Sequence, residues 1–249
     1  MERDIVWILF RKEWRQLLFK RSAVVSAVLL PVLMLLVIPG SMAMTARAPV
    51  RADKPLPPEL HFGLMGDLAA DPRKFAGAML PLMVSMVGLI LPLMMASFLL
   101  IIEKERRTLE LLIALPVRVQ HILTAKLLAT VTLSSLIAVP LLVIDIVALP
   151  LLGAADLSQV VALPLVLVAA IAFSSSGTLL VSLVANDFRS ANNFGGALIG
   201  PTLLVIVLLT AIVPGGVVRP LVIASLLGLG AVGLQVAARR LVTFERLLS

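Results

Sequence analysis

Residues 76–102 read AGAMLPLMVSMVGLILPLMMASFLLII, and residues 103–116 read EKERRTLELLIALP. The first stretch carries no charged residue, and it is longer than the roughly 20 residues that a helix needs to cross about 30 Å of hydrocarbon. The second stretch is dense in acids and bases, which belong in water. Because lipid forces a spanning segment to satisfy its own backbone groups, this pair of stretches predicts a transmembrane helix followed at once by an aqueous segment.

Five further apolar blocks accompany this one, so the sequence predicts an all-α integral membrane protein with six transmembrane helices. The composition agrees, since 60% of the 249 residues are hydrophobic and 14% are charged, against roughly 45–50% and 25% in soluble domains. We expect one transmembrane domain over residues 1–249. Its predicted spans cover residues 23–44, 76–102, 123–149, 160–184, 194–213 and 221–238.

The basic residues predict how the chain is oriented. Lys and Arg number 21 against 14 acids, for a net charge of +7, and they gather at the edges of the apolar blocks. If both termini are cytoplasmic, the inner segments hold more than twice as many bases as the outer ones, as the positive-inside rule requires. Residues 45–75 then form an extracytoplasmic loop and residues 239–249 a cytoplasmic tail. This distribution argues against a nucleic-acid interface, and the high Leu, Val and Ala content favours a bacterial inner membrane.

Residues 1–22 are too charged to span a membrane, and they predict an amphipathic helix at its surface. The face that would anchor in the interface holds Trp7, Phe10, Trp14, Leu17 and Leu18. A signal peptide is the alternative, because Ser-Met-Ala at 41–43 resembles a cleavage site. The basic region before it is too long and too amphipathic for a signal peptide.

The aqueous segment at residues 103–122 predicts a short cytoplasmic helix between the second and third spans. Thr108 can cap this helix through its hydroxyl, and Pro116 can end it. Leu109, Leu112 and Ile113 would share one face. A helix held between two spans can act as a lever if a partner grips it.

This segment resembles the signature of type 2 ABC export permeases, which runs roughly E-[KR]-E-x-G-T-L-E-x-L-L-x-x-P. Arg107 stands where the family usually has Gly, and Ala125 replaces the Gly that precedes Lys126. The matching residues are Glu103, Lys104, Glu105, Thr108, Leu109, Glu110, Leu112 and Pro116.

The resemblance extends over nearly the whole chain, although the segment at 103–116 is its specific part. The opening, with Lys12, Glu13 and Pro31, is similar to the family's entry helix and first span. Residues 177–201 are similar to the loop that joins its fourth and fifth spans.

The resemblance implies a permease subunit of an ATP-binding cassette exporter, which works as a dimer with a second permease subunit, identical or homologous. Separate ATPase subunits would bind ATP and Mg, because this chain has no P-loop motif; we expect no enzyme activity, no catalytic residue and no cofactor in the chain itself. The short helix would be the coupling helix that docks on the ATPase. The implied docking residues are Glu103, Glu105, Arg106, Arg107, Thr108, Leu109, Glu110, Leu112 and Ile113.

Several residues inside the spans invite a functional or a packing interpretation. Asp145 is an acid well inside the third span, where snorkelling to the outer interface or a hydrogen bond to a neighbouring helix is the commoner explanation. Ser175 and Ser176 can line a substrate path, or they can bond to helices. Gly196 and Gly200, followed by Pro201, form a GxxxG pattern that favours packing within one subunit, with a dimer interface or translocation path as the alternatives.

Other function classes fit the sequence less well. A stand-alone secondary transporter or channel would need more charge within the spans or a filter, and an intramembrane enzyme would need converging catalytic groups. A structural membrane-assembly subunit remains an alternative. We expect no metal site, because the chain has no cysteine and the predicted topology places His61 and His121 on opposite sides of the membrane.

Overall fold

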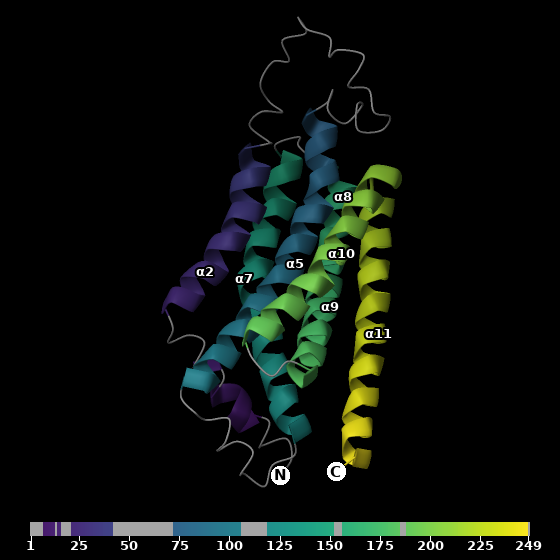
Figure 1. Cartoon of the computed structure of the whole chain (residues 1–249). Coiled ribbons are helices and arrows are strands. Elements are labelled where there is room, and N and C mark those ends of the chain that lie inside the picture. Colours follow the sequence, from purple (N-terminus) through teal and green to yellow (C-terminus); the bar gives the residue numbers. More distant parts are fainter. Residues whose placement is uncertain are drawn as a thin grey trace, which may run out of the picture.

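A computed structural model of the chain is a bundle of long helices that run along one common axis (Figure 1). The structure describes residues 7–12, 14–15, 21–41, 72–105, 119–151, 156–184 and 188–248. Within these residues the regular structure is helical throughout. The predicted all-α class is therefore confirmed.

The helices keep the order of the predicted apolar blocks. Four of them extend three or more residues beyond the predicted spans, because flanking polar residues continue the same helix. The elements are α2 (Arg21–Val32), the π-helix η1 (Leu33–Val37), α5 (Pro72–Glu105), α7 (Val119–Leu151), α8 (Leu157–Val161), α9 (Leu163–Val184), α10 (Phe188–Ile212) and α11 (Val218–Leu248).

Five helical stretches among the described residues are long and apolar enough to cross a membrane, and they correspond to the last five predicted spans. In the first block the apolar helical part is shorter, at Val28–Ser41. The count of six spans and the interfacial role of residues 1–22 therefore stay predictions. The five stretches are Gly77–Ala96, Thr124–Leu151, Leu157–Thr178, Asn193–Ile212 and Val218–Ala238.

The first block changes its helical geometry just after a proline. Pro31 lies inside α2 and has no N–H to donate to the carbonyl four residues earlier. The wider π turn η1 follows at once, and the backbone N–H of Ile38 donates to the carbonyl oxygen of Leu33, five residues back. Insertions of this kind into α-helices bend them locally and recur at functional positions.

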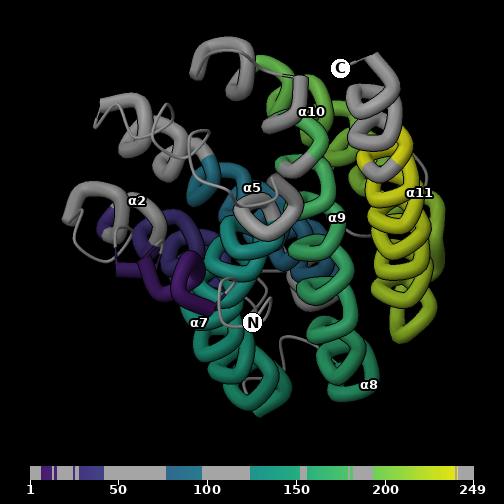
Figure 2. Tube along the Cα trace, turned by 90° about the horizontal axis from the view of Figure 1, so that it is seen from below, coloured from purple at the N-terminus to yellow at the C-terminus, as the bar shows by residue number. Residues whose placement is uncertain are grey.

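Helix α5 is the centre of the bundle. It contacts α2, η1, α7, α9, α10 and α11, and the view along the bundle shows these helices arranged around it (Figure 2). Two-thirds of its apolar span is buried, a larger share than in the other four spans. The hydrophobic core follows its length, from Leu80 through Val84 and Leu91 to Met95.

Gly88 lets α5 and α9 approach each other closely. A Cβ atom placed on Gly88 would lie 2.6 Å from the Cβ of Ala170 and 3.3 Å from the carbonyl oxygen of Leu167. Small residues that let helix backbones meet are the usual means of packing in membranes. The absence of a side chain at Gly88 therefore sets the α5–α9 distance.

The first proline of α5 frees a carbonyl that a neighbouring helix satisfies. Pro81 cannot donate to the carbonyl oxygen of Gly77, four residues earlier. Instead, the side-chain amide of Gln159, buried on α8, donates to this oxygen. This hydrogen bond links the proline-containing part of α5 to the start of the α8–α9 segment.

A second polar contact joins the two helices near Pro92. The hydroxyl of Ser174 on α9 donates to the carbonyl oxygen of Leu89 at 2.5 Å. Leu89 directly follows Gly88, whose carbonyl loses its helical partner because of Pro92. Each proline of α5 therefore has a donor from α8 or α9 at or beside the carbonyl that it frees.

A buried arginine closes the turn between α10 and α11. Val213 directly follows α10, and Gly216 adopts a positive φ of 84° in the turn that comes next. The guanidinium of Arg219, which is 3% exposed, donates from Nε and Nη2 to the carbonyl oxygen of Val213 at 3.2 and 3.0 Å. This charged side chain caps the end of α10.

We expect Gly88→Ala to lower the stability of the bundle. The new methyl group would overlap Ala170, and overpacking of this kind costs about 1–3 kcal/mol. The measurement is unfolding of the detergent-solubilised chain by heat or by a denaturing detergent.

The matched control is Gly233→Ala on α11, where an added Cβ meets nothing within 4 Å. Alanine is the better helix former by about 1 kcal/mol, so this variant should be as stable as the original chain or more so. Equal behaviour of the two variants would contradict the close approach at Gly88.

We expect Gln159→Met to destabilise the chain by leaving the Gly77 carbonyl unpaired, at about 1–3 kcal/mol. In a Pro81→Ala background, residue 81 regains an N–H that can bond Gly77 within α5. The cost of Gln159→Met should then shrink, which a double-mutant cycle of unfolding free energies measures. Additive effects of the two substitutions would refute the coupling.

Candidate functional site

The predicted coupling segment begins where α5 ends. Glu103 and Glu105 belong to the last turn of α5, and α7 begins at Val119. The remaining predicted docking residues, Arg106 to Ile113, lie outside the described residues. The described structure thus fixes the two helices to which the segment is attached.

The ends of four segments lie at the same end of the bundle. These are the helical residues 7–15, the end of α5, the beginning of α7 and the end of α11 (Figure 1). The two helices that flank this segment therefore share one end of the bundle with residues 7–12 and 14–15 and with the end of α11.

The aromatic side chains near the N-terminus form a continuous row. The rings of Trp7 and Phe10 stack at 5.1 Å between centroids, and those of Phe10 and Trp14 lie 5.8 Å apart. Trp7 is 57% exposed, whereas Trp14 packs against the hydrophobic core. Leu17 and Leu18, which the sequence places on the same face, lie outside the described residues.

Asp145 lies on the buried face of α7. Its side chain is 4% exposed, and Oδ2 has no hydrogen-bond partner among the described residues. This burial differs from snorkelling, one of the two explanations that the sequence favoured, because the helix turns Asp145 inward. Thr130 and Ser134 are buried on the same face, at intervals that bring them within about 60° of Asp145 around the helix.

The hydroxyl groups of residues 174–176 and 178 on α9 differ in whether they form a hydrogen bond. Ser174 joins α9 to α5, and the hydroxyls of Ser176 and Thr178 donate to carbonyls of their own helix at 2.7 Å. Ser175 is buried, and its Oγ has no hydrogen-bond partner among the described residues. Ser175 is therefore the member of this cluster that has polar capacity left for a ligand.

The GxxxG pattern of α10 faces outward. Gly196, Gly200 and Pro201 are exposed, and a Cβ atom on either glycine would meet nothing within 4 Å. Packing within one subunit, which the sequence favoured, is thus absent among the described residues. The neighbouring Gly195 packs against Leu93 of α5 instead.

Two buried polar residues that have a role in the fold were not identified from the sequence. Gln159 falls at the edge of a predicted loop, and Arg219 falls in the loop predicted before the last span. Pro81 is the signal that a donor to Gly77 is needed, but only the pairing of α5 with α8 identifies Gln159 as that donor. Within the part of the chain that the structure describes, no three His, Cys, Asp or Glu side chains are grouped as metal ligands.

Comparison with known families places these helices in context. Residues 5–214 match the family model described as ABC-2 type transporter. A search of curated proteins and a search of solved structures each found no match. The match covers most of the chain, including the segment at 103–116 on which the resemblance rested, and this family forms the transport subunit of its complexes. The chain therefore belongs to the ABC-2 type transporter family, as a multi-pass transmembrane permease.

Proposed function

We propose that this chain is the membrane-spanning subunit of an ATP-driven exporter, in which two permease subunits enclose the translocation path and separate ATPases supply the energy. The family match over residues 5–214 carries this proposal. The placement of both termini in the cytoplasm, and of the protein in a bacterial inner membrane, belongs to the same proposal. The bias of basic residues toward the predicted inner segments supports it.

The attachment of the coupling segment supports a mechanism. Closure of the ATPase dimer would move residues 103–122, and with them the ends of α5 and α7. Because α5 packs closely on α9 at Gly88 and Ala170, and α9 forms an extensive pair with α11, movement of α5 would carry α9 and α11 along. A rigid-body shift of this kind can convert an inward opening into an outward one.

Three buried polar atoms are candidates for the lining of the path. They are Oγ of Ser134, Oδ2 of Asp145 and Oγ of Ser175, each without a hydrogen-bond partner among the described residues. An unpaired polar group inside a span is costly. A rearrangement that opens α7 and α9 to water or cargo would relieve this cost.

The outward face of α10 is evidence for a contact with a second permease subunit. Gly196 and Gly200 leave a flat strip, bordered one turn later by Leu204, which is 61% exposed. Small residues spaced four apart allow two spans to approach at the backbone. We therefore place the contact with the second permease on this face.

If residues 103–122 dock on the ATPase, Glu110→Arg should lower the affinity of the permease for the ATPase. Charge reversal at a docking surface sets like charges against each other, and a loss of about 1.4 kcal/mol already means a tenfold drop in affinity. The measurement is the amount of ATPase that co-purifies with the permease when both are expressed from neighbouring reading frames.

The matched control is Glu59→Arg, the same substitution in the loop predicted on the opposite side of the membrane. It should leave co-purification unchanged. Full retention of the ATPase by the Glu110→Arg and Leu109→Asp variants, with normal transport, would show that this segment does not dock.

The α10 contact predicts that a cysteine at position 204 cross-links two subunits in the membrane. The chain has no cysteine of its own, so Leu204→Cys gives a single reactive site. Gly200→Leu in the same chain should abolish the cross-link, because the added side chain keeps the helices apart.

Val143→Cys on α7 is the control, since this residue is 51% exposed on another face of the bundle. Cross-linking is read as a dimer band on a non-reducing gel. Equal yields at positions 143 and 204 would contradict a contact centred on α10.

A further inference from the structure

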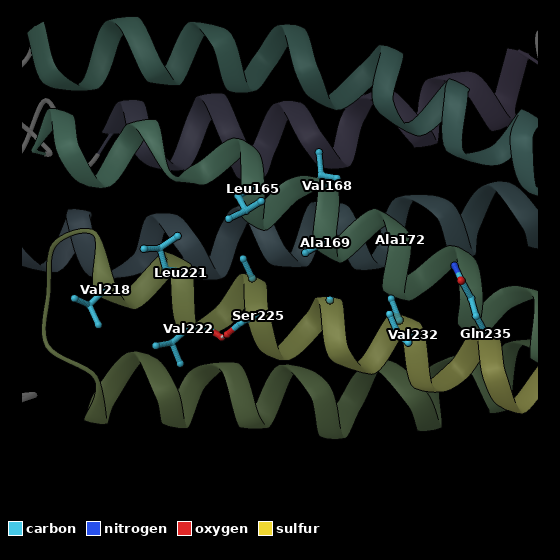
Figure 3. Close-up of a pocket in the computed structure, with 13 residues that line it drawn as sticks. Leu165, Val168, Ala169, Ala172, Val218, Leu221, Val222, Ser225, Val232 and Gln235 are labelled. Carbon is cyan, nitrogen blue, oxygen red and sulfur yellow. The ribbon is translucent and has the colours of Figure 1, made fainter.

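An apolar groove of about 770 Å³ runs along the surface between α9 and α11. Figure 3 shows side chains of both helices along it, from Val218 at one end to Gln235 at the other. Its volume falls in the range of about 300–1,000 Å³ that is usual for small-ligand sites. The lining residues with the smallest side chains are Ala169, Ala172, Ala224, Gly228 and Ala231.

The groove lies along two helices that are long and apolar enough to cross a membrane. Its lining residues belong to the spans Leu157–Thr178 and Val218–Ala238. The distance along α11 from Val218 to Gln235 is about 26 Å at 1.5 Å per residue, close to the roughly 30 Å of a bilayer core. Apolar lining side chains on both helices, such as Val168 and Val232, are more than half exposed, so the groove opens toward the lipid.

The shape of the groove favours a thin occupant. Helices α9 and α11 pack directly against each other along their length, so the space between them is a seam. A helix with side chains is about 10–12 Å across and would rest on this seam without entering it. An acyl chain is a single row of methylene groups and can lie along the seam.

Few polar groups line the groove between its two ends. The hydroxyl of Ser225 already donates to the carbonyl oxygen of Val222 at 2.9 Å. The other lining residues between Val218 and Gln235 have apolar side chains or none. An apolar chain can therefore cover this surface without leaving a buried donor unpaired.

Polar and basic residues gather at one end of the groove. Gln235 is exposed and lies at this end (Figure 3). Arg239 and Arg240 follow within the next turn and a half of α11. By helical spacing Arg239 lies within about 40° of Gln235 around the axis, whereas Arg240 lies about 140° away. Basic residues at the edge of a span attract anionic lipid headgroups. A lipid with its chain in the groove would bring its phosphate to this end.

We propose that the α9–α11 groove binds an acyl chain of an anionic bilayer phospholipid, with the headgroup held at the end where Gln235 is followed by Arg239 and Arg240. This site is separate from the predicted ATPase contact and from the outward face of α10. Lipid binding in the groove tests neither of those two proposals. If either of them failed, the proposed lipid site would be unaffected.

The first test fills the groove with a side chain. A Cβ on Gly228 meets nothing within 4 Å, and the same holds for Gly233, which does not line the groove. Gly228→Leu and Gly233→Leu are therefore matched substitutions on one helix. The two variants and the unaltered chain would be reconstituted with phosphatidylglycerol and phosphatidylcholine, and retained lipid would be measured by native mass spectrometry.

We expect the unaltered chain and Gly233→Leu to retain phosphatidylglycerol, and Gly228→Leu to lose it. Arg239→Gln combined with Arg240→Gln should remove the preference for phosphatidylglycerol over phosphatidylcholine. Equal retention by the Gly228→Leu and Gly233→Leu variants would overturn the site, as would an unchanged lipid preference in the arginine variant.

The second test uses the unaltered chain and does not depend on how a variant folds. Phosphatidylglycerol with a photoreactive group along its acyl chain would be activated in vesicles, and the labelled residues mapped. We expect labels on Val168, Leu221 and Val232 in excess of those on Val139 and Val143, which are exposed on α7 outside the groove. Even labelling of both sets would overturn the proposal.

Discussion

Hydrocarbon offers no hydrogen bonds to a helix, and this constraint shapes the middle of the bundle. Helix α5 carries two prolines inside its span, each of which removes a backbone donor. Gln159 of α8 supplies the missing donor at Gly77, and Ser174 of α9 donates to Leu89, beside the carbonyl that Pro92 frees. Helix α5 therefore depends on α8 and α9 for hydrogen bonds near both prolines.

The same contacts determine which helices would move together. Direct packing at Gly88 holds α5 to α9, and α9 in turn holds α11. Helix α10 has fewer buried residues and presents its glycines outward. Helix α5 therefore connects α9, α10 and α11, while the face of α10 that holds Gly196 and Gly200 points outward.

Glycines show why a motif alone does not assign a role. Gly195 and Gly196 are neighbours in the sequence, yet Gly195 packs against Leu93 while Gly196 faces outward. In the same way, Ser174 and Ser175 are adjacent, but one bonds to α5 and the other has no partner among the described residues. Each helix turns by about 100° per residue, so adjacent residues meet different surroundings.

The sequence by itself determined the helical class, five of the spans and the family, because long uncharged blocks and a charged motif are local features that need no partner. It also located the prolines and glycines at which helices bend or approach. The tertiary structure alone decided the donor that reaches Gly77, the burial of Asp145, the cap that Arg219 places on α10 and the groove between α9 and α11. Each of these depends on which helix faces lie together, and that pairing is set by contacts between residues far apart in the chain.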